Sequence, residues 1–181
     1  DRFETAANIA AKLDGDPEKA IVANAYQFAD ALSVASYASQ NGYPIVLSAQ
    51  DKLSKASNKV LKDIDEKIVV GGENAISTEI FDSFEEATRY SGLNRYETSA
   101  EIAKHLTPQT SKAILATGTT FADALAGSVL AAKEGAEILL VKKEEVPEDI
   151  MEAIDMDDIS NFRVIGGENA VSEEVVKQLK K

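Results

Sequence analysis

Two arginines and two aspartates occupy corresponding places along this chain, and they are the residues best suited to hold a charged ligand. Arg2 comes just before the segment ETAANIAAKL and Asp30 lies in FADAL, while Arg95 and Asp123 hold the same places farther along. An arginine oriented by a carboxylate presents a fixed fork of N–H donors to a phosphate or carboxylate ligand. The simpler alternatives are a structural ion pair, and an aspartate that stabilises the first turn of its helix. The residue types leave these alternatives open.

The chain is poor in residues that support catalysis. It has no cysteine, and His105 is its single histidine, which excludes disulfides, thiolate chemistry and any paired-histidine site. The glycine pairs at 71–72 and 166–167 are followed by Glu-Asn-Ala and do not match a nucleotide-binding pattern. The acidic run DMDD at 155–158 falls at a predicted helix end in one place only. We therefore predict no enzymatic activity and no cofactor or metal.

Composition narrows the class of partner. A formal net charge of -12 argues against nonspecific nucleic-acid binding, which depends on lysine and arginine neutralising phosphates. No apolar run is long enough to cross a bilayer, so we predict no membrane partner either. The hydrophobic fraction of 44% and charged fraction of 28% are typical of a globular protein.

The order of sequence blocks shows an internal duplication. Residues 1–48 align without a gap against residues 94–141, so that KAIVANAYQFADAL matches KAILATGTTFADAL. Later, VVGGENAIS at 69–77 matches VIGGENAVS at 164–172. Because the blocks recur in the same order, we predict two equivalent domains, residues 1–86 and 87–181.

Each copy alternates between helical and strand periodicity. Short apolar runs rich in β-branched residues predict buried strands, and the segments between them have apolar residues at helical spacing. Such alternation indicates an α/β fold with two doubly wound repeats, each a short parallel sheet flanked by helices. In the first copy the predicted helices span 4–13, 28–40, 51–64 and 76–84, and the predicted strands span 19–23, 44–48 and 67–70.

The repeated blocks resemble a known family, the cell wall binding repeat 2 modules of clostridial and related Gram-positive surface proteins. NRYETSAEIA, KAILATGTTFADALAGSVLAAKEGAEILLV and FRVIGGENAVS, with their counterparts in the first copy, support the resemblance over nearly the whole chain. The family implies a toprim-like fold for each repeat and noncovalent anchoring of S-layer and surface proteins to an anionic cell-wall polysaccharide. It also implies a cell-surface location, no catalysis, and further repeats of the same array or an oligomer as partners, usually three repeats about a pseudo-threefold axis.

The resemblance assigns a role to seven residues of this chain. Its arginine and aspartate positions, and an Ile-Leu-Leu strand implicated in anchoring, correspond to Arg2, Arg95, Asp30, Asp123, Ile138, Leu139 and Leu140. The first copy has Ile45, Val46 and Leu47 at the strand positions. The apolar character of these strands by itself predicts core packing, so that losing anchorage on mutation would also follow from misfolding.

An anionic polymer is repelled by a charge of -12, so local arginines, backbone N–H groups or bridging divalent cations must attract it.

The segment ATRYSGLN at 87–94 leads into the second copy and has no counterpart before Asp1, so we expect the chain to be cut from a longer array. The alternative functions are a structural assembly module without its own ligand site and, less favoured, a metal-dependent phosphotransfer enzyme.

Overall fold

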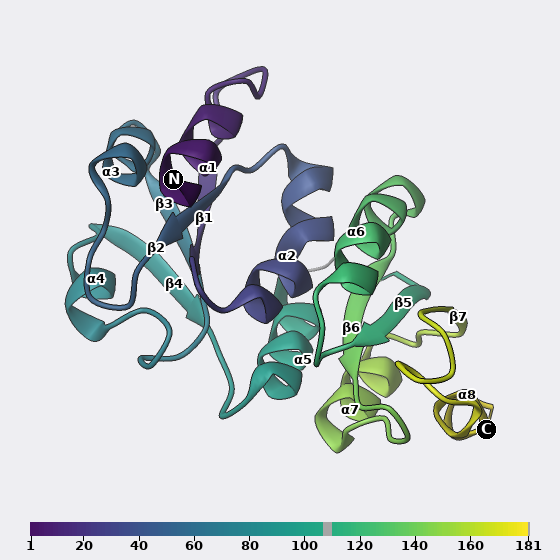
Figure 1. Ribbon diagram of the computed structural model, residues 1–181. Coiled ribbons are helices and arrows are strands. Elements are labelled where there is room, and N and C mark those ends of the chain that lie inside the picture. Colours follow the sequence, from purple (N-terminus) through teal and green to yellow (C-terminus); the bar gives the residue numbers. More distant parts are fainter. Residues whose placement is uncertain (107–109, 181) are drawn as a thin grey trace.

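The structure is a computed structural model that describes residues 1–106 and 110–180. Its first unit consists of α1 (Arg2–Ala10), β1 (Lys19–Asn24), α2 (Phe28–Asn41), β2 (Ile45–Ser48), α3 (Lys55–Leu61), β3 (Glu66–Val70), α4 (Thr78–Asp82) and β4 (Glu86–Tyr90). Its second unit consists of α5 (Arg95–Leu106), β5 (Lys112–Thr117), α6 (Ala122–Glu134), β6 (Glu137–Val141), α7 (Glu148–Met156), β7 (Asn161–Ile165) and α8 (Glu173–Leu179). Figure 1 shows the two units side by side, with the chain ends at opposite sides of the molecule.

Each unit contains a parallel sheet covered by helices, as the sequence predicts. The strands are ordered β2-β1-β3-β4 in the first unit and β6-β5-β7 in the second. Every strand pair is parallel, with β1 and β5 at corresponding interior positions. These two strands are almost wholly buried, which explains their nearly continuous apolar sequences. The predicted fold class is confirmed.

The strand β4 was not among the predicted elements. Residues 87–94 were expected to lead into the second copy, but Glu86–Tyr90 pairs in parallel with β3 and extends the first sheet. Arg89 on β4 donates hydrogen bonds to the carbonyls of Gly71 and Ile76, each at 2.9 Å, and its guanidinium lies 4.7 Å from the centre of the Phe81 ring. These long-range contacts stabilise a segment whose sequence alone does not indicate a strand. The strand spans the predicted boundary between 1–86 and 87–181, and that boundary stays a prediction.

Local signals determine where several helices begin and end. Gly42 and Gly135 follow α2 and α6 in the left-handed conformation, with φ of 70° and 63°, which ends both helices. Ser77 caps α4 by accepting a hydrogen bond from the Ile80 N–H. The helix predicted over 51–64 is shorter, because Ser54 caps it and α3 begins at Lys55.

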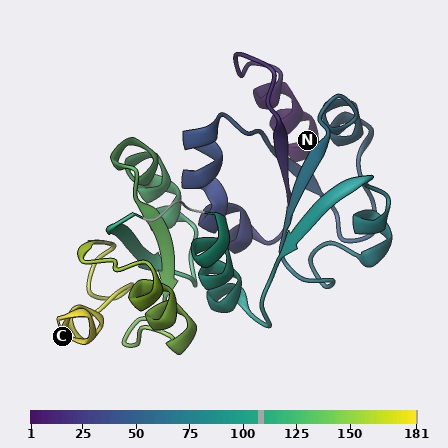
Figure 2. The same cartoon turned by 180° about the vertical axis from the view of Figure 1, so that it is seen from behind.

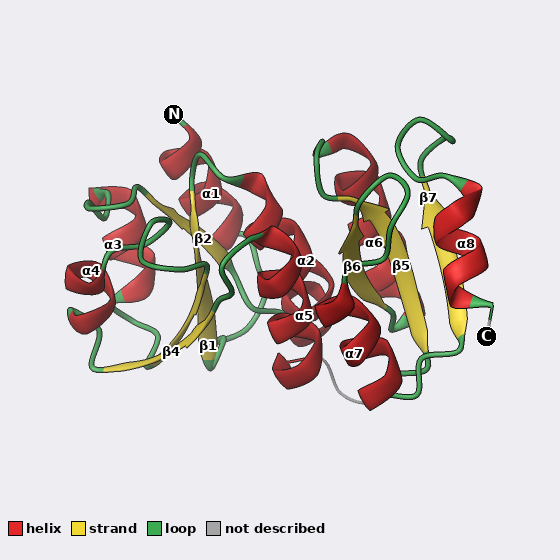
Figure 3. Cartoon of the chain, turned by 90° about the horizontal axis from the view of Figure 1, so that it is seen from below, coloured by secondary structure: helices red, strands yellow, loops and turns green. Residues whose placement is uncertain are grey.

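Helix α2 lies between the two sheets and belongs to both cores. Its residues Val34 and Ala38 pack in the core of the first sheet, whereas Ala29 and Leu32 pack in a core cluster of the second, together with Ile138. Figures 1 and 3 both show α2 and α5 between the sheets, and Figure 2 shows the same arrangement from behind. The two units are therefore joined by a shared apolar interface.

Candidate binding site at the junction of the two units

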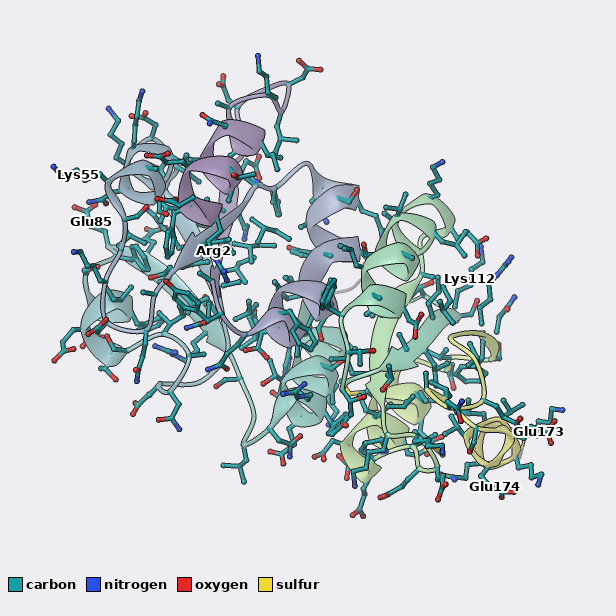
Figure 4. All side chains as sticks on the ribbon, viewed as in Figure 1. Arg2, Lys55, Glu85, Lys112, Glu173 and Glu174 are labelled. Atoms are coloured by element: carbon teal, nitrogen blue, oxygen red, sulfur yellow. The ribbon has the colours of Figure 1, made fainter. Side chains whose placement is uncertain are left out.

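Each candidate arginine holds a loop of its own unit. Arg2 donates a hydrogen bond to the Ala25 carbonyl at 2.7 Å, and its guanidinium lies 4.8 Å from the centre of the Tyr26 ring. Arg95 donates to the carbonyl of Gly118 in the corresponding loop. Both loops follow the interior strand of their sheet, so the arginines perform the same structural task in the two copies. Figure 4 labels Arg2 in the first unit, whereas Glu173 and Glu174 lie at the far end of the second unit.

Arg95 also acts on the first unit. Its guanidinium lies 5.6 Å from the centre of the Phe28 ring at the start of α2. Asp30, in the first turn of the same helix, is only 6% exposed. Burial raises the pKa of Asp30 from 3.8 to about 6, and the positive charge of Arg95 opposes that shift. The electrostatic partner of Asp30 is thus the arginine of the other copy.

The within-copy pairing of arginine and aspartate is not formed. Among the salt bridges of residues 1–106 and 110–180, none joins Arg2 to Asp30 or Arg95 to Asp123. The reason is geometric: each arginine is hydrogen-bonded to its own loop, and the carboxylate of Asp30 lies beside Gly71. The four residues therefore do not make two equivalent ion pairs.

Both aspartates pack against a glycine that follows the third strand of their sheet. A methyl group added to Gly71 would lie 2.6 Å from Oδ2 of Asp30, and one added to Gly166 would lie 3.0 Å from Oδ2 of Asp123. Both glycines have positive φ, 101° and 122°. The first glycine of each pair is therefore needed for backbone conformation and for space beside the carboxylate.

A groove of about 870 Å³ opens at this junction. Three segments line it: residues 26–30 after β1, residues 72–75 after β3, and the connection between the units with the start of α5. Its charged residues are Asp30, Glu73, Arg95 and Glu97. In an open α/β sheet, ligands bind beyond the carboxyl ends of the strands, and this groove lies at that edge of the first sheet.

The cap of α5 builds one wall of the groove. Oδ1 of Asn94 accepts hydrogen bonds from the N–H groups of Tyr96 and Glu97, at 2.9 and 3.2 Å. The Glu97 carboxylate in turn accepts from the Leu93 N–H at 2.8 Å and from the Asn94 side chain at 2.5 Å. This is a reciprocal helix cap, so the hydrogen-bonding capacity of Glu97 is largely used within the protein.

The Ile-Leu-Leu strand is inside the molecule. Ile138, Leu139 and Leu140 on β6 are 2%, 0% and 1% exposed. Ile138 and Leu140 pack in the same cluster as Leu32 of α2, so they form part of the interface between the units. In the first unit Val46 is buried and its neighbours on β2 are partly buried. The predicted core packing of these strands is confirmed.

The acidic run at 155–158 lies at the end of α7, as predicted. Oδ2 of Asp157 is buried without a hydrogen-bond partner in the structure, and burial together with Asp158 raises the pKa of Asp157. Across residues 1–106 and 110–180, no group of three or more His, Cys, Asp or Glu is placed to hold a metal ion. None of the helices in these ranges has the length and apolar character that crossing a membrane requires.

Sequence reasoning missed several residues that line the groove. Glu73 and Asn74 belong to the repeated Gly-Gly-Glu-Asn segments, which in the sequence were considered only as a nucleotide-binding pattern. Tyr26 and Phe28 flank Asp30 but were not singled out. The repeated segments were a usable signal, because polar residues after a third strand lie at the same sheet edge as those after the first.

Comparison with known proteins agrees with this architecture. The chain is 38% identical over 181 residues to the N-acetylmuramoyl-L-alanine amidase LytC of Bacillus subtilis (strain 168), covering 99% of the chain and 36% of that protein. It is 34% identical over 182 residues to the amidase enhancer of the same strain, covering 98% and 25%. The chain thus spans only about a third or a quarter of these relatives.

Solved structures and a family model match nearly the entire chain. Cwp8 from Clostridium difficile superposes with a TM-score of 0.88 at 30% identity, over 99% of this chain and 32% of that one. Cwp6 from the same organism gives 0.89 at 26% identity, over 99% and 30%. The model of cell wall binding domain 2 matches twice, at residues 1–81 and 89–176. The chain belongs to the cell wall binding domain 2 family and contains two copies of its domain.

Proposed function

We propose that this chain is a non-catalytic anchoring module that binds an anionic secondary polymer of the Gram-positive cell wall noncovalently. It would thereby hold a surface protein at the cell wall or S-layer. The observation that carries the proposal is the groove at the junction, which both units build and which lies at the ligand-binding edge of a sheet. Family membership in both halves of the chain supports the wall as the target.

The non-catalytic part of the proposal rests on the extent of the matches. The amidase LytC is matched over 36% of its length, and that matched part has the sequence of a binding domain. An anchoring module of this kind would bring a neighbouring effector region to its wall substrate. We place the protein at the cell surface on the same grounds.

We further propose that an additional repeat of the same family packs against α6. In α2, Leu32 and Ser36 are 7% and 0% exposed, because the second unit covers them. Their sequence equivalents on α6, Leu125 and Val129, are 53% and 60% exposed, and Phe121 beside them is 56% exposed. The surface that the second unit covers on α2 is therefore open on α6, and a unit of the same shape fits it.

The complementary surface lies on α1. Ile102 of α5 is 1% exposed because it packs in the core of the first sheet, on the side of α2. Its equivalent on α1, Ile9, is 61% exposed. A third repeat would therefore cover α1 with its own equivalent of α2, and it would cover α6 with its own equivalent of α5. The same packing would place an arginine beside Asp123 and an aspartate beside Arg2.

The test is sedimentation with purified Gram-positive cell walls. The chain alone and the chain extended by a third repeat are incubated with walls, and the bound fraction is measured after centrifugation. Binding by the extended form supports the proposal, whereas a folded protein that binds in neither form would overturn it. Arg2→Ala and Arg95→Ala address the arginines: unchanged wall binding by both folded variants would remove them from the site.

A further inference from the structure

Asp30 is a buried carboxylate that lines the groove and accepts no hydrogen bond from the part of the chain that the structure describes. It lines the groove and is only 6% exposed. Within residues 1–106 and 110–180, no hydrogen bond or salt bridge ends on its side chain, and the influence of Arg95 on it is electrostatic. A buried carboxylate normally accepts two or more hydrogen bonds, and leaving it without them is costly. The side chain is therefore available to a donor that enters the groove.

The charges around Asp30 oppose an anionic ligand group at this place. Glu73 is exposed on the groove wall, and Glu97 is engaged in the cap of α5. Arg95, the groove's cation, is hydrogen-bonded to Gly118 and lies against the ring of Phe28. An anion entering the groove would meet more carboxylates than cations. Like charges raise the free energy of binding by amounts that grow as water is excluded.

The rim of the groove adds an apolar surface. Tyr26 lines it and is 65% exposed, with its ring packed edge-on against Phe3 at 6.2 Å between ring centres. An aromatic ring next to a buried acceptor suits a compact molecule with an apolar face and polar edges. A pyranose ring, with C–H groups on its faces and hydroxyl groups at its edge, has that shape.

We infer that the groove at the junction receives a sugar residue through its hydroxyl or amino hydrogen-bond donors, with Asp30 as the acceptor. The anionic groups of the polymer then lie outside the groove. This inference rests on the proposed wall binding and names the part of the polymer that the groove contacts. Any attraction of the polymer's negative charges has to come from other surfaces of the protein.

The direction in which Asp30→Asn changes the binding affinity tests the inference, measured in the form of the protein that sediments with walls. Asp30→Asn removes the charged acceptor and should weaken binding roughly 10-fold, because a hydrogen bond to a charged group is replaced by a weaker one to a neutral amide. If the groove held a phosphate or carboxylate instead, the same change would relieve repulsion and tighten binding. Tighter or unchanged binding by folded Asp30→Asn overturns the inference.

A second pair of variants does not depend on changing a buried residue. Glu73→Lys reverses a charge on the groove wall, and Glu79→Lys makes the same change at an exposed position of α4 outside the groove. Both changes make the protein surface more attractive to an anionic polymer. The ratio of the two variants' binding affinities therefore reports the effect that is specific to the groove. We expect Glu73→Lys to bind no more tightly than Glu79→Lys. A more than threefold tighter Glu73→Lys would show an anionic group in the groove and overturn the inference.

The outcomes separate this inference from the proposed function. Suppose that the unsubstituted protein sediments with walls, but that Asp30→Asn binds more tightly or Glu73→Lys binds more than threefold more tightly than Glu79→Lys. Wall binding then stands, and the assignment of Asp30 as acceptor of a sugar donor fails. If the folded, unsubstituted protein fails to sediment in either form, the proposed function fails and the inference fails with it. Thermal unfolding followed by circular dichroism shows that each variant is folded before its binding is compared.

Discussion

The charge of Arg95 acts on the carboxyl of Asp30 although the two residues belong to different units of the chain. Each residue recurs in the other copy, but the electrostatic interaction between Asp30 and Arg95 depends on how α2 and α5 pack between the sheets (Figure 1). The junction thus combines a buried acid of one copy with a cation of the next, and the groove opens beside them.

The first prediction concerns the pH dependence of stability. The pKa of Asp30 is raised from 3.8 to about 6 by burial, so the folded protein binds this proton more tightly than the unfolded chain. Protonation of Asp30 therefore stabilises the folded state. This stabilisation is complete below the pKa of the unfolded chain and is lost as the pH rises through about 6. The wild type should gain roughly 2–3 kcal/mol relative to Asp30→Asn between pH 7 and pH 4. Urea unfolding at four pH values measures this difference, and a difference that stays constant with pH would contradict the assignment.

The second prediction concerns the glycine beside Asp30. Gly71→Ala places a methyl group 2.6 Å from Oδ2 of Asp30 and 2.8 Å from Cβ of Ala75, at a φ of 101°. Strain and overpacking together should lower the free energy of unfolding by roughly 3 kcal/mol. Gly167→Ala is the matched control, because a methyl group there meets nothing within 4 Å. Equal effects of the two substitutions in denaturant unfolding would show that the close approach does not matter.

The third prediction compares two equivalent leucines. Leu32→Ala removes a side chain that is 7% exposed and packed between the units, and should cost about 2–4 kcal/mol of stability. Leu125→Ala changes a side chain that is 53% exposed, and should alter stability by less than about 0.5 kcal/mol in this chain. Thermal unfolding gives both values. In a chain extended by a third repeat, Leu125→Ala should become costly, and an unaltered effect there would count against the proposed packing.

The fourth prediction concerns the strand that the family resemblance links to anchoring. Leu140 is 1% exposed at the interface between the units, so Leu140→Ala should destabilise the protein by about 2–4 kcal/mol. Any loss of wall binding should then follow the fraction of folded protein measured by circular dichroism at the same temperature. A fully folded Leu140→Ala variant that no longer sediments with walls would instead indicate a direct contact with the ligand.

The sequence by itself determined the duplication, the α/β class and most elements of each sheet. These features depend on local pattern: continuous apolar runs form buried strands, and Gly42 and Ser77 stop or start helices through their own backbone or side chain. The burial of Ile138, Leu139 and Leu140 also followed from their apolar character.

Only the tertiary structure decided how the copies meet. Equivalent positions such as Leu32 and Leu125, or Ile9 and Ile102, have the same residue type but opposite exposure, because just one of each pair lies between the two sheets. The strand β4 depends on hydrogen bonds of Arg89 to residues well before it in the chain. For the same reason Asp30 is coupled to Arg95 rather than to Arg2: docking of whole units, which no local pattern records, sets the partners of side chains at the junction.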